Sequence, residues 1–218
     1  MKGKCKICGN EYTQSGMSRH LKSCLNKNYE KIIDKDQSQK SLYYHIYVKG
    51  TYRSDYWLQL QVKADTKLSD LDSFLRDIWL ECCNHLSEFE INEQRFTSRE
   101  FNMSNKIKDV LREKCKFLYT YDFGSYTKLD LNVVNVFKAE EREEKISVLA
   151  RNNPPKIKCN HCDNLAEFIC PDCVYKGVGW YCSDCLDKHE ENDFFRTSDN
   201  LLPVVNSPRV GVCAYTGS

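Results

Sequence analysis

Four Cys-x-x-Cys pairs constrain this chain more than any other feature, because each pair places two thiols on one tight turn. They belong to a set of thirteen cysteines in 218 residues. The opening residues, MKGKCKIC, lack the apolar stretch of a secretory signal, and no run reaches the roughly eighteen apolar residues of a membrane helix. We therefore expect a cytoplasmic protein, in which paired thiols bind metal and seldom form disulfides.

The first pair opens a compact motif, Cys5-x2-Cys8-x11-His20-x3-Cys24. His20 and Cys24 are four residues apart, so they can share one face of a helix. Zinc takes four such soft or borderline donors in a tetrahedron. Tyr12 and Met17 stand where a ββα finger keeps its small apolar core. The stretch resembles a Cys-Cys-His-Cys finger, and it predicts one zinc ion.

The other three pairs belong to a denser C-terminal cluster. Its donors are Cys159, Cys162, Cys170, Cys173, Cys182, Cys185 and His189. Seven donors are one short of two tetrahedral sites, and Cys213 is the only Cys or His further along the chain. His161 lies inside the first pair, where its geometry is poor for a second metal, so we do not expect it to be a ligand.

The spacing of this cluster resembles the cross-braced B-box, RING and MYND modules. That resemblance implies that the first and third pairs share one zinc ion, while the second pair shares another with His189 and Cys213. A simpler arrangement would join the neighbouring pairs Cys159–Cys162 and Cys170–Cys173 in one site. We favour the cross-brace because the loop lengths match its alternation. Three zinc ions are therefore expected in all.

The remaining cysteines and histidines carry no metal motif. Cys82 and Cys83 follow a predicted helix, near the end where the helix dipole disfavours a thiolate. We interpret them, with Cys115, as packing residues, and His45 and His85 as parts of the fold. No arrangement suggests a catalytic nucleophile, and four protein ligands at each predicted site leave no position for a reacting water. We expect no catalytic residue.

The net charge of +1 hides an uneven distribution. Residues 1–41 carry nine Lys/Arg against four Asp/Glu, whereas residues 156–218 carry six against nine. A basic arm indicates an anionic partner, although a solvated lysine-rich terminus with no partner would have the same composition. The candidates for nucleic-acid contact are Lys4, Lys6, Arg19 and Lys22. Of the predicted base-facing positions, Thr13, Gly16 and Arg19, only the last carries a strong base-reading side chain.

The middle of the chain reads as an α+β domain, with a sheet packed on a helix. Alternating apolar residues predict strands in LYYHIYVKG, in Tyr56–Val62, in KFLYTY and from Leu129 to Val133. Leu71, Phe74, Leu75, Ile78 and Trp79 fall at helical spacing. The predicted organisation is a finger over 1–25, a polar linker over 26–41, an α+β domain over 42–150 and a two-zinc module over 151–218.

LYYHIYVKG, YWLQLQVKADTKLSDLDSFLRDIW, HLSEFEI and KFLYTYDFGS resemble the plasmid open-reading-frame-three-like family, which includes insertion-element passengers. The resemblance covers roughly residues 42–137, and YDFG is its most specific piece. The family usually continues with Asp, Trp and His, where this chain has Ser125, Thr127 and Leu129. The resemblance implies an α+β fold and a mobile-element context, with no defined reaction.

These features together predict a zinc-stabilised, non-enzymatic binding or adaptor protein. The basic N-terminal arm would contact nucleic acid or another acidic partner, and the C-terminal zinc module would contact protein. The alternative is an accessory enzyme of DNA processing, related to nucleases or recombinases, whose site the sequence does not reveal. The aromatic residues Tyr119, Tyr121, Phe123 and Tyr126 would either stack on unpaired bases or form the core face of the sheet.

Overall fold

A computed structural model describes residues 1–30, 40–98, 101–190 and 201–217. The chain forms two compact units. We call residues 1–75 and 86–153 the sheet unit, and residues 76–85 and 154–218 the cysteine-rich unit. No helix within the described ranges has the length and apolar character needed to cross a membrane.

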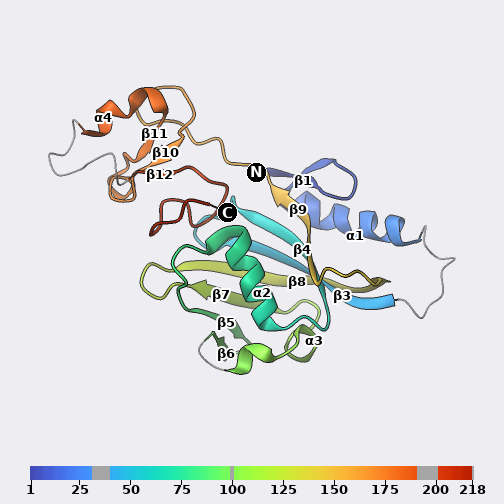
Figure 1. Ribbon diagram of the computed structural model, residues 1–218. Coiled ribbons are helices and arrows are strands. Elements are labelled where there is room, and N and C mark those ends of the chain that lie inside the picture. Colours follow the sequence, from blue (N-terminus) through green and yellow to red (C-terminus); the bar gives the residue numbers. More distant parts are fainter. Residues whose placement is uncertain (31–39, 99–100, 191–200, 218) are drawn as a thin grey trace. The chain divides into compact units, whose positions relative to one another are not determined.

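The sheet unit contains nine strands, and every neighbouring pair is antiparallel (Figure 1). The strands are β1 (Lys2–Cys5), β2 (Glu11–Thr13), β3 (Lys40–Gly50), β4 (Trp57–Lys63), β5 (Ser87–Ile91), β6 (Gln94–Thr97), β7 (Lys116–Tyr121), β8 (Thr127–Glu140) and β9 (Ile146–Asn152). Their order across the sheet is β2-β1-β9-β4-β3-β8-β7-β5-β6. The predicted α+β class is confirmed.

One face of this sheet packs against helix α2 (Leu68–Leu75). Ile46 pairs with Leu60 on one side and Val133 on the other, and all three are fully buried. Asp72 of α2 anchors the helix, because its carboxylate accepts hydrogen bonds from Tyr119 on β7 at 2.7 Å and Ser87 on β5 at 2.6 Å. Apolar burial therefore forms this core, and one buried carboxylate fixes the helix over it.

The opposite face packs against helix α1 (Gln14–Glu30). Met17, Leu21 and Leu25 of α1 are buried in one cluster with Trp57 and Leu149 of the sheet. Gln59 Nε2 donates to Ser18 Oγ at 2.8 Å, and Gln59 Oε1 lies 2.5 Å from Nε2 of the buried His45. These hydrogen-bonded side chains connect α1 to strands β4 and β3. The sheet unit also contains two short turns of helix, η3 (Phe101–Ser104) and α3 (Ile107–Val110).

The cysteine-rich unit has little regular structure. Its elements are a π-helical turn η2 (Arg76–Leu80), the two-residue strands β10 (Phe168–Ile169), β11 (Trp180–Tyr181) and β12 (Leu202–Pro203), the 3-10 turns η4 (Val174–Lys176) and η5 (Ser183–Cys185), and helix α4 (Asp187–Glu190). The strands form a small sheet in the order β11-β10-β12.

The two units do not follow the predicted boundaries. The segment 1–25 is part of the sheet unit, because β1 pairs with β9 through Gly3, Lys4 and Cys5. Helix α1 continues to Glu30, and residues 31–39 of the predicted linker lie outside the described residues. The predicted helix through Trp79 divides into α2 and η2, and η2 belongs to the cysteine-rich unit.

Candidate metal centres

The N-terminal motif brings its four predicted donors together. The ligand atoms of Cys5, Cys8, His20 and Cys24 all lie within 4.8 Å of one another. A tetrahedron with Zn–S bonds of about 2.3 Å and Zn–N bonds of about 2.0–2.1 Å has S–S edges of about 3.8 Å and S–N edges of about 3.6 Å. Cys8 Sγ lies 3.3 Å from His20 Nε2, close to that edge. The group has the dimensions of a zinc site.

The protein prepares these side chains for a cation in two ways. Tyr12 stacks on the His20 ring, with ring centroids 4.1 Å apart, and so fixes the direction of the imidazole. Burial lowers the pKa of His20, so the imidazole is neutral at pH 7, as a metal ligand must be. A backbone hydrogen bond from Asn10 lowers the pKa of Cys8, whereas burial raises the pKa of Cys24 to about 12. A bound cation would favour both thiolates.

The finger packs against the sheet, so part of the helix surface that could contact nucleic-acid bases is covered. Met17 faces the sheet, and Gln14 and Ser18 bond to Tyr47 and Gln59. Thr13 Oγ1 accepts a hydrogen bond from the Gly16 N–H at 3.3 Å, so the hydroxyl caps α1. Arg19 and Lys22 are exposed on the outer side of the helix.

The other candidate basic residues lie elsewhere on the finger. Lys4 points away from its buried neighbours Gly3 and Cys5, because side chains alternate along a strand. Its side chain therefore projects from the sheet face opposite to α1. Lys6 is also exposed, on the loop between the two cysteines. The basic side chains thus lie around the finger and not in one row on its helix.

In the cysteine-rich unit, the first and third cysteine pairs come together. Cys159, Cys162, Cys182 and Cys185 form one group, in which Cys162 Sγ lies 3.5 Å from Cys182 Sγ and 3.7 Å from Cys185 Sγ. This is the pairing that the cross-brace requires; the neighbouring pairs do not share a site. Burial raises the pKa of Cys185 to about 12. Burial also acts on Cys159, but backbone N–H groups, that of His161 first, lower its pKa to about 7.

The second pair joins His189 in a group of three buried donors. Cys170, Cys173 and His189 have their ligand atoms within 4.8 Å of one another, and the N–H of Cys173 donates to Cys170 Sγ at 3.3 Å. The ring of Tyr181 lies against both His189 and His161, at centroid distances of 5.1 Å and 5.3 Å. His161 thus packs beside the centre without joining either group of donors.

Cys213 is not the eighth ligand of this module, so that prediction is wrong. Its Sγ lies 3.5 Å from His85 Nε2 and 3.9 Å from Cys83 Sγ, in a group that also contains Cys82. The interpretation of Cys82, Cys83 and His85 as packing and fold residues missed this group. The described residues therefore contain four Cys/His groups that could each hold a metal ion, and not three. Cys115 lies outside them, 4.0 Å from Asn92 Oδ1.

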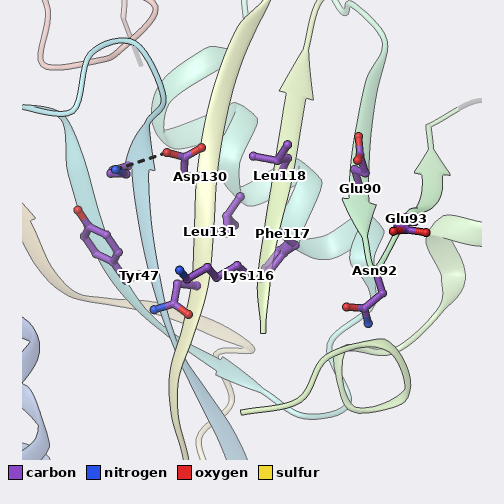
Figure 2. A pocket seen from close by; sticks show the side chains of 11 residues that line it. Tyr47, Glu90, Asn92, Glu93, Lys116, Phe117, Leu118, Asp130 and Leu131 are labelled. Carbon is purple, nitrogen blue, oxygen red and sulfur yellow. Dashed lines mark ion pairs between the residues drawn. The ribbon is translucent and has the colours of Figure 1, made fainter. Parts of the chain in front are cut away.

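The sheet unit also has an open groove of about 590 Å³ on the face shared with α1. Figure 2 shows Glu90, Lys116 and Asp130 on neighbouring strands along it. Lys49 Nζ pairs with the Asp130 carboxylate at 3.5 Å. The lining contains no Cys, His or Ser, and its charged side chains are mixed in sign.

The aromatic residues near YDFG divide between core and surface. Tyr119 and Tyr121 are fully buried, whereas Phe123 and Tyr126 are about half exposed in the turn that joins β7 to β8. Asp122 shapes this turn, because its Oδ1 accepts the N–H groups of Gly124 and Ser125. Leu129, where the family usually has His, is a core residue with no exposed surface.

Comparisons with known proteins give a family match and a weak structural likeness. The family described as "Plasmid pRiA4b ORF-3-like protein" matches residues 41–169, which extend beyond 42–137 into the cysteine-rich unit. A crystal structure of a protein of unknown function from Methanosarcina mazei Go1 is 20% identical, with a TM-score of 0.45, over 51% of this chain and 69% of that chain. The search for curated relatives gave no match. Because the family match spans more than half of the sequence, the chain belongs to the plasmid pRiA4b ORF-3-like protein family.

Proposed function

We propose that this is a non-enzymatic, zinc-stabilised binding protein, in which zinc occupies the N-terminal centre and the two centres of the cross-brace. The main support is that two of these centres have four protein donors each, which is a complete tetrahedral set. Both four-donor groups consist of thiols and imidazole alone, a set that selects zinc over the hard cations that prefer oxygen. Four protein donors fill a tetrahedral ion, so neither centre has a position at which a water could be activated.

The Cys170–Cys173–His189 centre is the place to look for the alternative, an accessory enzyme of DNA processing. The described residues supply three donors there, and a zinc ion with three protein ligands can hold a water. Catalysis would also need a base or a substrate-binding group beside that water. The nearest aromatic partner, Tyr181, is fully buried against His189 and offers neither.

The first experiment measures zinc and activity on the same full-length preparation. Metal analysis should find zinc at no fewer than three equivalents, and incubation with single-stranded, double-stranded and plasmid DNA should produce no cleavage or joining. Zinc-dependent turnover that disappears in Cys173→Ser, while the other centres keep their metal, would overturn the non-enzymatic proposal. Absence of zinc from protein that is folded and reduced would overturn the metal proposal itself.

The partner of the N-terminal region is proposed to be anionic, with nucleic acid as the main candidate. Lys4, Lys6, Arg19 and Lys22 are exposed on the finger, which supports phosphate contacts without sequence readout. One finger buries too little surface for specific duplex binding. The C-terminal zinc module would in turn contact protein.

A comparison of charge-neutralised variants tests whether the finger binds nucleic acid. Deleting the first 41 residues would strip β1 from β9 and α1 from Trp57, so point variants are the cleaner choice. Changing Lys4, Lys6, Arg19 and Lys22 to Gln should weaken binding at least tenfold and flatten its salt dependence. The matched control changes four other exposed lysines to Gln: Lys67, Lys114, Lys116 and Lys138. Equal loss in both variants, or no binding by the native chain, would exclude the finger as the nucleic-acid site.

A further inference from the structure

The fourth Cys/His group is built from two segments 128 residues apart, between His85 and Cys213. Both segments belong to the cysteine-rich unit. The distances of 3.9 Å between the Cys83 and Cys213 sulfurs and 3.5 Å from Cys213 Sγ to His85 Nε2 match the edges of a zinc tetrahedron, about 3.8 Å and 3.6 Å. A disulfide would instead need sulfurs about 2.05 Å apart. We propose that Cys82, Cys83, His85 and Cys213 form a further zinc site, which clamps the C-terminal segment onto residues 76–85.

The residues around the first segment hold its three donors in a tight turn. Arg76 spans the turn, because its guanidinium donates to Glu81 at 3.0 Å, to Asn84 Oδ1 at 3.2 Å and to the His85 carbonyl at 2.6 Å. Asn84 has a φ of 54°, a left-handed conformation that Asn tolerates better than most residues. This reversal brings His85 back toward the two adjacent cysteines.

The C-terminal segment is anchored before it reaches the site. Ser207 Oγ donates to the Trp79 carbonyl of η2 at 2.6 Å and accepts the Arg209 N–H at 2.9 Å. Gly211 has a φ of 74°, and a Cβ there would lie 2.4 Å from the Ile169 side chain, so only glycine fits. Cys213 follows with a φ of 54°. The backbone adopts two left-handed residues within three positions, and the result is a thiol placed beside His85.

A buried cation balances the charge that this site would carry. Three thiolates and a neutral imidazole around Zn²⁺ have a net charge of −1. The Arg209 guanidinium is fully buried, and its Nη2 donates to Cys82 Sγ at 3.3 Å. A positively charged donor to a ligating sulfur is a typical outer-shell partner of a metal-bound thiolate. The site therefore has donors, geometry and an outer shell.

Exposure separates this site from the Cys170 group. Cys83 and Cys213 are exposed and Cys82 and His85 are half-buried, whereas the donors of the Cys170 group are buried throughout. Chelators reach exposed ligands first, so the clamp should lose its zinc before the Cys170 centre. The proposal rests on this donor set alone and does not depend on the protein being non-enzymatic.

The test counts zinc in full-length protein purified with reductant and without added metal. Native mass spectrometry should find one zinc more in the wild type than in Cys83→Ser/Cys213→Ser, with the remaining ions retained as proof of folding. The matched control, Cys115→Ser, should keep the wild-type count. Equal counts in the wild type and the double variant would overturn the proposal, as would a Cys83–Cys213 disulfide in the reduced preparation.

A second measurement needs no variant. The native protein is treated with increasing chelator and pulsed with N-ethylmaleimide, and the labelled cysteines are located by peptide mass spectrometry. We expect Cys82, Cys83 and Cys213 to be protected at first, and then to become labelled together with release of one zinc, before Cys170. Full labelling of the three clamp cysteines in untreated protein would overturn the proposal.

Discussion

The sheet unit buries apolar side chains on both faces of its sheet, whereas the cysteine-rich unit has a few large buried side chains and three of the four Cys/His groups of the described residues. The strands of the sheet reach fourteen residues, and those of the cysteine-rich unit have two. Short strands satisfy few backbone groups, and few apolar residues offset little of the conformational entropy of folding. We therefore expect burial to stabilise the sheet unit and, under the proposed zinc binding, metal to stabilise the cysteine-rich unit.

The N-terminal centre sharpens this contrast, because it lies in the sheet unit. Its donors Cys5 and Cys24 belong to the same buried cluster as Trp57 and Leu149. A zinc ion bound there would therefore add to a core that the sheet already supplies. In the cysteine-rich unit, by contrast, two of the buried clusters consist mainly of the metal donors themselves.

The largest expected effect is that of metal removal. A structural zinc site contributes roughly 10–16 kcal/mol to folding, so a chelator should unfold the cysteine-rich unit and leave the sheet unit folded. Far-UV and near-UV circular dichroism would show partial loss of structure that is restored by added zinc. A chelated protein that loses all near-UV signal would contradict the separation between the units.

A core truncation should have the opposite pattern. Leu60 is fully buried, and Leu60→Ala should lower the unfolding free energy of the sheet unit by about 2–5 kcal/mol without changing the zinc count. Denaturant unfolding and metal analysis on the same samples measure both effects. Leu118→Ala is the control, because Leu118 is 38% exposed and should change stability by at most about 0.5 kcal/mol. Loss of zinc from the centres of the cysteine-rich unit in Leu60→Ala would show that the units are coupled.

Acidification should weaken the sheet unit through His45. Burial lowers the pKa of His45 to about 4, with a smaller contribution from the positive charge of Lys22. The unfolded chain takes up this proton near pH 6.5, so the stability is complete above that pH and is lost as pH falls to about 4, by at most about 3 kcal/mol. His45→Gln should remove this part of the pH dependence.

The measurement compares unfolding of the two proteins between pH 7 and pH 4 while released zinc is monitored. The difference between them isolates His45 from the metal ligands, which also take up protons in acid. Parallel pH profiles for the wild type and His45→Gln would show that His45 contributes nothing.

The smallest predicted effect tests the packing of strand β1 of the finger against the rest of the sheet. A Cβ at Gly3 would lie 2.2 Å from the Arg151 carbonyl oxygen and 2.6 Å from the Trp57 ring. Gly3→Ala should therefore cost about 1–3 kcal/mol by overpacking, and thermal melting would detect it. Gly124→Ala, whose nearest contact would be an ordinary 3.4 Å to Asp122 Oδ1, is the matched control. Equal melting temperatures for the two variants would argue against this packing.

Sequence spacing predicted the candidate metal centres whose donors are close in the chain. Cys-x-x-Cys pairs and His20 four residues before Cys24 are local patterns, and the structure brings those residues together. The clamp lacked such a pattern, because Cys82 and Cys83 are adjacent and their partner Cys213 is far along the chain. Spacing alone places Cys213 at the nearest incomplete site, but the backbone anchored at Ser207 directs it to His85 and Cys83.

The strands were predictable for a similar reason, and their partners were not. Alternation marked the strands that hold Ile46, Leu60 and Leu131, since each faces a buried layer. Nothing local indicates that β1 pairs with β9, because that contact depends on Gly3 allowing close approach to Trp57. The structure therefore brings the four predicted donors of the finger together and adds strand β9 and Trp57 to its surroundings.

Hydrogen exchange followed by mass spectrometry, before and after chelation, tests the central claim most directly. It reports protection segment by segment on the intact chain. After chelation we expect residues 156–190 and 201–217 to exchange freely, while β3, β4 and β8 keep the protection that they had with metal. Protection lost throughout both units, or retained in the cysteine-rich unit without zinc, would contradict the account.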